Sequence, residues 1–286
     1  MGRQGSRRGT LARMRLAVAA LVILALQLTG APAVHTQSPE IDELRRRVAA
    51  YTRRFITQFS NVVTEEEYDQ RFTISTRRRR LTSDFLLVAY PGKKDLVMVF
   101  RDVRQVDGKA VRDQEDRIVR LLVQPFDNAV RRARDIHRDG LRFNVDNGRM
   151  MDPLTAIGYL QLEYQAGFRF SLGGVASDIG PDVREIDLVP TAARGRTASQ
   201  ARVWVSESTG EVFKTELRSG FGARAQVTTT TFGPDPVLKI RVPVEMRDEV
   251  PRGGDDFIGI ARYSNVRRFE VTTESVVAVP DSSNPR

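Results

Sequence analysis

The sequence predicts an α+β fold in which helices cover an antiparallel sheet. Three observations predict it: an amphipathic helix pattern begins near residue 38, alternating segments joined by tight turns fill most of the chain, and a helical stretch separates two groups of these segments. Consecutive short strands with tight turns favour antiparallel pairing over βαβ units.

The first 33 residues have the pattern of an export signal. A basic segment with Arg3, Arg7, Arg8, Arg13 and Arg15 precedes an apolar run from Leu16 to Leu28, and Ala31-Pro32-Ala33 offers an A-x-A cleavage site. The run is shorter than the roughly 20 residues that span a bilayer. We therefore predict a signal peptide over 1–33, a mature domain over 34–286 in the periplasm or outside the cell, and no stable membrane span after cleavage. The Arg7-Arg8 pair leaves the general and twin-arginine export routes open, and an uncleaved anchor is the alternative to cleavage.

Composition excludes several classes of function. The chain has 286 residues, no Cys and two His, which excludes a disulfide framework, a thiol nucleophile and a Cys-ligated metal, and argues against a His-rich metal centre. The net charge of +9 falls to +4 once the five arginines of the signal are removed. The charge of the mature chain therefore gives little reason to expect a nucleic-acid partner. No cofactor and no metal are expected.

The first element after the signal is a helix. Ser38-Pro39-Glu40 supplies a capping Ser, a Pro at the first helical position and an acidic first turn. An apolar stripe with helical spacing follows: Ile41, Leu44, Val48, Tyr51, Phe55, Phe59 and Val62. We expect this stripe to lie on an apolar sheet face.

A first group of strands follows the helix. Residues 63–72 alternate, with Glu66, Tyr68 and Phe72 on one face; 81–90 has the pattern of a central strand, and 96–106 leads into an Asp107-Gly108 hairpin turn. The run Arg77–Arg80 between two of these strands has two interpretations, a solvated hairpin loop or a contact with anionic lipid headgroups.

The middle of the chain has helical spacing, and the last third returns to alternation. Helices are predicted over 116–123, 126–137 and 153–162, within a helical insertion at about 113–162. Strands are predicted over 168–172, 184–189, 201–206, 212–217, 223–232, 237–244 and 262–273.

Few residues carry a pattern of enzyme chemistry. Gly220-Phe-Gly222-Ala-Arg-Ala225 matches a dinucleotide fingerprint, but a Thr-rich strand follows where a helix is required. His137 fits a helix C-terminal turn better than a general base, and the row Glu65–Glu67 fits a solvated strand face better than a carboxylate pair. No catalytic residue is assigned.

One hairpin and its surroundings resemble a known family. The stretch Ala201–Leu217, with Trp204, the Gly210 turn and Lys214, resembles a hairpin of outer-membrane lipoprotein-sorting proteins of the LolA/LolB-like superfamily. Val242–Met246 and Ala261–Phe269 resemble the closing strands of that superfamily, and the upstream half is similar to uncharacterised secreted bacterial proteins. The resemblance implies a half-barrel, that is, a curved antiparallel sheet whose concave apolar face is covered by helices and receives acyl chains.

Three functions are compatible with these expectations. The first is a periplasmic carrier or sensor that binds a lipid, or the acyl chain of a lipoprotein, in the half-barrel cavity. The alternative is an envelope interaction or structural protein with a filled core and no small-molecule ligand, and an enzyme comes last. The candidate lining residues are Phe72, Phe85, Leu87, Trp204, Phe213 and Leu217, with ordinary core as the other reading of Trp204. An envelope protein is a further expected partner.

Overall fold

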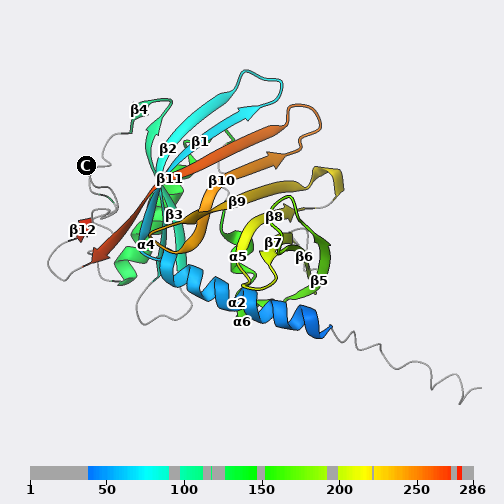
Figure 1. Cartoon of the computed structure of the whole chain (residues 1–286). Coiled ribbons are helices and arrows are strands. Elements are labelled where there is room, and N and C mark those ends of the chain that lie inside the picture. Colours follow the sequence, from blue (N-terminus) through cyan, green and yellow to red (C-terminus); the bar gives the residue numbers. More distant parts are fainter. Residues whose placement is uncertain are drawn as a thin grey trace, which may run out of the picture. The chain divides into compact units, whose positions relative to one another are not determined.

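The strands that follow residue 62 form one antiparallel sheet. The computed structural model describes residues 38–89, 97–111, 117, 126–146, 152–191, 199–220, 222–271 and 276–278. Eleven strands follow the order β4-β3-β2-β1-β11-β10-β9-β8-β7-β6-β5, and β12 pairs with β11 beside this path. The two ends of the order, β4 and β5, do not pair, so the sheet is open (Figure 1). The predicted fold class, a large antiparallel sheet with few helices, is confirmed.

Most elements begin and end close to their predicted positions. The strands are β1 (Val62–Phe72), β2 (Arg78–Ala89), β3 (Val97–Val106), β4 (Lys109–Ala110), β5 (Phe168–Val175), β6 (Val183–Pro190), β7 (Ser199–Ser206), β8 (Val212–Ser219), β9 (Gln226–Asp235), β10 (Ile240–Val250), β11 (Phe257–Val271) and β12 (Val276–Ala278). The helices are α2 (Pro39–Phe59), α4 (Phe126–Leu141), α5 (Thr155–Gly158) and α6 (Leu162–Gln165), with a 3-10 turn, η2, at Gly222–Arg224.

Three predicted segments need correction. The helix predicted over 153–162 is two four-residue helices, α5 and α6, because the chain is extended at Gln161 (φ −63°, ψ 140°) between them. The strand predicted over 237–244 starts at Ile240, since Lys239 adopts a positive φ of 52° in the preceding turn. Arg78–Arg80 belong to β2 and not to a loop, because they pair with Asp69–Arg71 of β1.

Other predictions lie outside the described residues. These are the export signal with its cleavage site, and the helix over 116–123 apart from the helical Arg117. The predicted Asp107-Gly108 turn is described, and both of its residues have positive φ, 50° and 78°.

The pairing of β1 with β11 joins the two groups of strands. The register runs from Val62 opposite Arg268 to Phe72 opposite Phe257. Strands that precede the helical stretch therefore share one sheet with strands that follow it.

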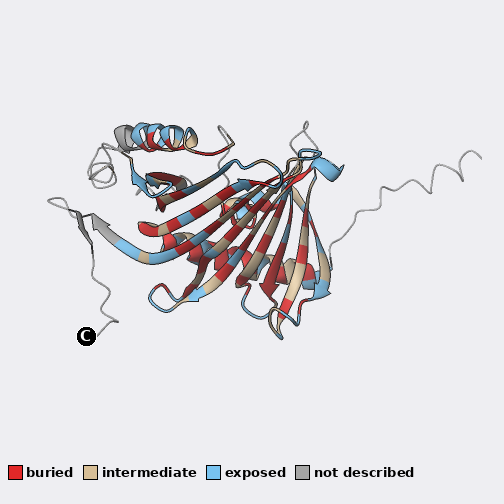
Figure 2. Cartoon of the chain, turned by 90° about the horizontal axis from the view of Figure 1, so that it is seen from above, coloured by how far each residue is buried: buried red, intermediate tan, exposed pale blue. Residues whose placement is uncertain are grey.

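Helix α2 covers the apolar face of this sheet. Its predicted stripe is buried, with Leu44, Val48, Tyr51, Phe55 and Phe59 each at most 3% exposed. The helix contacts β10, β2 and β5, so it crosses strands that lie far apart in the sheet order (Figure 1). Figure 2 shows the strands alternating between buried and exposed positions, as expected for a sheet with one covered face.

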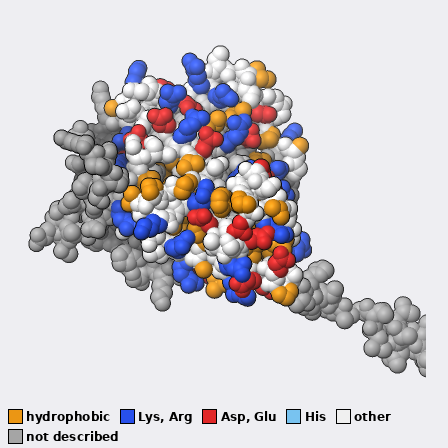
Figure 3. All heavy atoms as spheres, viewed as in Figure 1, with side chains coloured by type: hydrophobic (Ala, Val, Ile, Leu, Met, Phe, Trp, Pro, Cys, Tyr) orange, Lys and Arg blue, Asp and Glu red, His pale blue; other side chains and the backbone are white. Residues whose placement is uncertain are grey.

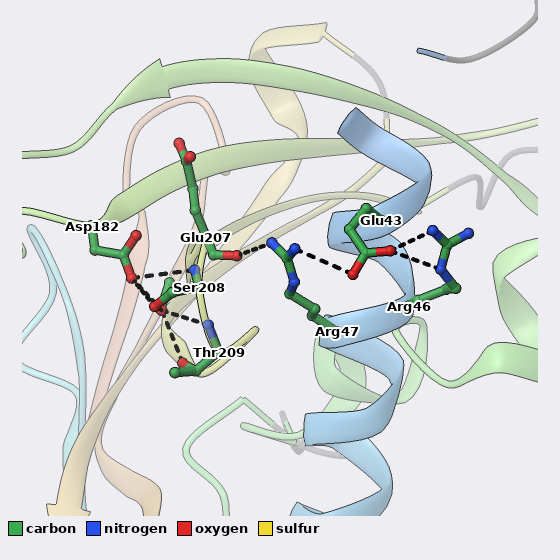
Figure 4. A network of polar contacts seen from close by, with 8 residues as sticks. Glu43, Arg46, Arg47, Asp182, Glu207, Ser208 and Thr209 are labelled. Carbon is green, nitrogen blue, oxygen red and sulfur yellow. Dashed lines mark hydrogen bonds and ion pairs between the residues drawn. The ribbon is translucent and has the colours of Figure 1, made fainter. Parts of the chain in front are cut away.

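The turn between β7 and β8 docks directly on the backbone of α2. Arg47 of α2 donates to the carbonyl of Glu207 at 2.7 Å (Figure 4). Gly210 has a φ of 71°, and a Cβ there would lie 2.6 Å from the carbonyl oxygen of Arg47 and 2.6 Å from the nitrogen of Val48. Asp182 holds the turn from the other side by accepting from the hydroxyls of Ser206, at 2.6 Å, and Ser208, at 2.5 Å.

We expect Gly210→Ala to destabilise the fold strongly. The left-handed backbone costs an L-residue about 1–2 kcal/mol, and the new methyl group must also push α2 away from the sheet. The free energy of unfolding should fall by more than about 2 kcal/mol in urea denaturation. The matched control is Gly108→Ala, since Gly108 has a similar φ of 78° but nothing within 4 Å of its Cβ. Equal losses in the two variants would contradict the close packing of the turn on α2.

Candidate functional site

The inner face of the sheet carries one continuous apolar cluster. Four of the six candidate lining residues belong to it: Phe72, Phe85, Leu87 and Leu217, all at most 7% exposed. Two of them make aromatic contacts with β11: Phe72 with Phe257, at a ring-centroid distance of 5.8 Å, and Phe85 with Tyr263, at 5.3 Å. These four side chains are buried by the chain's own residues in this structure.

Trp204 and Phe213 lie in a different place. Trp204 packs with Ala176 and Val183 in a small separate cluster, and Phe213 packs against the same cluster. The indole nitrogen of Trp204 donates to Glu185 at 3.0 Å, and the ammonium of Lys214 lies 4.4 Å from the ring centroid. The six candidates therefore do not line one space.

A bulge in β8 explains the position of Phe213. Strict alternation would put Phe213 on the same face as Thr215 and Leu217. The register shifts between Trp204, opposite Lys214, and Val205, opposite Val212, so Phe213 is an extra residue on its strand. Val212 takes the inward position instead and joins the apolar cluster.

A short segment, Leu154–Gln165, forms a second cover beside α2. Its residues Leu154, Ile157 and Leu160 are at most 6% exposed and join the apolar cluster, and α5 contacts β8, the strand of Leu217. Gln165 ties the segment to α2: its amide donates to the carbonyl of Arg45 at 3.1 Å and accepts from the Arg45 guanidinium at 3.2 Å. The cover segment thus rests on three large aliphatic side chains, on the smaller Ala156 and the partly buried Tyr159, and on one amide anchor.

A buried ion pair interrupts the apolar face. Glu66 and Arg101 are 0% and 1% exposed, and Nη2 of Arg101 donates to Oε1 of Glu66 at 2.5 Å while its Nε donates to Oε2. The guanidinium also lies 5.3 Å from the centroid of the Tyr68 ring. Alternation placed Glu66 on the same strand face as Tyr68 and Phe72, and a carboxylate on an apolar face requires a cation. This requirement could have pointed to Arg101 in the sequence, because Arg101 is a cation in an apolar strand segment that includes Phe100 and Val103.

Burial sets the protonation of the groups around this pair. Burial alone would lower the pKa of Arg101, but the Glu66 carboxylate outweighs it and raises that pKa above its ordinary value. Burial, and then the charge of Glu66, raises the pKa of Tyr263 well above its ordinary value, so this phenol stays neutral. Burial also raises the pKa of Asp152.

The residues considered for catalysis do not assemble into a catalytic group. His137 lies in α4, half-buried, and burial followed by the charge of Arg101 lowers its pKa. Glu65 pairs with Arg104 at 2.8 Å, whereas Glu67 is exposed. The glycine fingerprint continues through η2 into β9, so it lacks the helix that a dinucleotide site requires.

The surface holds charges of both signs. On the face seen in Figure 3, Lys and Arg side chains are interspersed with Asp and Glu, and several hydrophobic side chains lie between them. Within the part of the chain that the structure describes, no three His, Asp or Glu side chains are grouped as a metal site would require. Over the same residues, no helix combines the length and the apolarity needed to cross a membrane.

Comparison with known proteins gives similarities to solved structures. No protein-family model matches the sequence, and no curated protein matches it. A solved LolA superfamily protein from Nitrosomonas europaea aligns over 80% of this chain and 96% of its own, with 9% identity and a TM-score of 0.38. The chain is similar to LolA-like structures. A DUF1329 family protein from Desulfovibrio piger aligns over 80% of this chain and 93% of its own, with 12% identity and a TM-score of 0.40.

A third solved structure is described as an outer-membrane lipoprotein-sorting protein domain, from Vibrio parahaemolyticus. It aligns over 77% of this chain and 92% of its own, with 15% identity and a TM-score of 0.34. The resemblance expected from the sequence is thus confirmed as a similarity to LolA-like structures. All three TM-scores lie below 0.5, so the likeness assigns neither a ligand nor a partner to this chain.

Proposed function

We propose that the chain is a carrier or sensor in the periplasm or outside the cell, which takes a lipid or the acyl chain of a lipoprotein against the inner face of its sheet. The observation that carries the proposal is the cover segment Leu154–Gln165, which we interpret as a lid because two four-residue helices are all that it adds over the continuous apolar face. In the structure this segment packs against the apolar cluster.

The free energy lost on displacing each cover, the segment Leu154–Gln165 or α2, indicates which of them would open. Burying a large apolar side chain contributes about 1.5–3 kcal/mol, so the three aliphatics of the cover segment contribute roughly 5–9 kcal/mol. Burial of an acyl chain with ten methylenes contributes about 8 kcal/mol of binding free energy. For the cover segment, the free energy lost on displacing it is close to the free energy gained by burying the acyl chain. The exchange is unfavourable for α2, which buries six large side chains on the same face.

The alternative function is an envelope interaction protein with no small-molecule ligand. The burial of Phe85, Leu87 and Leu217 by the chain's own side chains favours it, because a filled core needs no lipid. The two functions differ in whether the cover segment opens, and that difference can be measured.

The test is calorimetric titration of the protein, purified from the cell envelope, with a long-chain fatty acid and a lipopeptide. Wild-type protein should bind saturably. Gln165→Ala removes the anchor to α2 and should tighten binding several-fold, because a closed lid reduces the apparent affinity. Leu217→Trp should weaken binding, because the larger side chain takes up apolar surface that the acyl chain would contact.

The matched control is Gln161→Ala. Gln161 lies in the same segment, but its amide donates only to the nearby carbonyl of Gly158, at 3.2 Å. Its affinity should equal that of wild type. Equal tightening in both variants would refute the gate at Gln165, and no binding of either acylated ligand would select the interaction protein.

A further inference from the structure

The outer face of the sheet carries a groove that the proposed function does not use. The groove has a volume of about 750 Å³ and lies over β1, β2, β11 and the β3–β4 turn. Its side chains include five arginines and only two aspartates. Ile258 and Ile260 alternate along β11 with the buried Phe257 and Ala261, so this groove lies on the opposite face from the apolar cluster.

Two arginines of the groove face each other across the strands. Arg71 of β1 is the register partner of Arg78 of β2, which brings their Cβ atoms to about 4.5–5.5 Å. Both side chains are exposed, and the described residues provide no ion pair to either of them. Opposed like charges destabilise a sheet. This arrangement is therefore a cost to the fold that a bound anion would remove.

The remaining arginines of the groove are already neutralised. Arg79 lies 3.5 Å from Asp107, Arg80 donates to Asp69 at 2.8 Å, and Arg262 lies 3.3 Å from Glu245 on β10. The positive charge available to a ligand is thus concentrated at Arg71 and Arg78.

An apolar floor adjoins the two arginines. Ile258 is the register partner of Arg71, and Ile260 is the partner of Asp69, so both side chains lie on the same face next to the arginine pair. A free anion or an acidic peptide would leave these isoleucines facing water. A molecule with a phosphate and a hydrocarbon portion matches both features, because guanidinium groups bind phosphate through paired hydrogen bonds.

We propose that this groove docks the protein on a membrane by binding the phosphate of an anionic phospholipid between Arg71 and Arg78. The hydrocarbon part of the same lipid lies over Ile258 and Ile260. The site is distinct from the acyl-binding interior, since it lies on the other face of the sheet.

The test is co-sedimentation of the envelope-purified protein with phosphatidylglycerol vesicles, with phosphatidylcholine vesicles beside them. The protein should prefer phosphatidylglycerol. An arginine near an anionic surface contributes roughly fivefold to binding, so Arg71→Gln/Arg78→Gln should weaken it roughly 20- to 30-fold. The melting temperature of this variant should stay equal or rise, because the like-charge pair is gone. Ile258→Thr should weaken vesicle binding even at high salt, where electrostatic attraction is screened.

The matched control is Arg53→Gln/Arg224→Gln, which removes the same charge from two exposed sites outside the groove. It should retain most of the binding. An equal loss in both double variants would mean that net charge alone acts, and would overturn the proposal. Protection of the fold by inorganic phosphate, without any preference among the vesicles, would assign a free anion and overturn it as well. Fatty-acid binding by the interior should be unchanged in all these variants, so the two proposals fail independently.

Discussion

Replacing Arg101 with Met should cost the fold about 3–5 kcal/mol. The substitution leaves the Glu66 carboxylate fully buried without its cation, and breaking a buried ion pair from one side typically costs this much. We expect a large fall in the urea midpoint and in the melting temperature, measured by circular dichroism. The loss exceeds that of an ordinary surface substitution because water cannot reach the uncompensated charge.

A double variant separates the ion pair from its packing. In Glu66→Gln/Arg101→Met neither side chain carries a charge, and replacement of a buried pair by neutral side chains of similar size is often nearly neutral. Most of the lost stability should therefore return, which gives a large coupling energy in the double-mutant cycle. Arg46→Met is the control, because its pair with Glu43 is solvent-exposed and contributes little to stability. Additive losses at Glu66 and Arg101 would contradict a coupled pair.

The regular elements could be predicted because their physical signals are local. A Ser-Pro start, a stripe at helical spacing and a sharp change of period at Val62 define α2 and β1 without any long-range information. The Asp107-Gly108 turn was equally predictable, because few residue pairs tolerate positive φ at both positions. Antiparallel pairing followed from the short connections.

The site could be predicted only in part because its positions depend on irregular or distant contacts. Leu217 lies in the apolar cluster, but one bulge turns Phe213 to the other face, and alternation along the sequence does not reveal it. The pairing of β1 with β11 brings residues close to 200 positions apart together, and only this pairing places Ile258 beside Arg71. The run Arg77–Arg80 was visible in the sequence, but its meaning depended on the discovery that Arg78 lies in a strand opposite Arg71.

Replacing Phe55 with Ala should cost about 3–5 kcal/mol, the usual range for a buried aromatic side chain. Phe55 is 1% exposed and lies near the C-terminal end of α2. Its ring stacks on Phe59 with centroids 5.3 Å apart and meets Phe232 of β9 edge-on at 6.4 Å, so it connects the helix to the middle of the sheet. The loss combines the buried area of the ring with a cavity that the flanking aromatics cannot fill.

The melting temperature of Phe55→Ala should fall clearly, whereas Arg53→Ala, on the exposed side of the same helix, should stay within about 0.5 kcal/mol of wild type. Hydrogen exchange would then locate the damage: amides of α2 and of β9 should exchange faster together, because one side chain links them. A negligible shift in Phe55→Ala would mean that α2 is only loosely attached. The comparison of the two covers would then reverse, because α2 would be as easy to displace as the segment Leu154–Gln165. Acyl chains would in that case enter beneath the long helix.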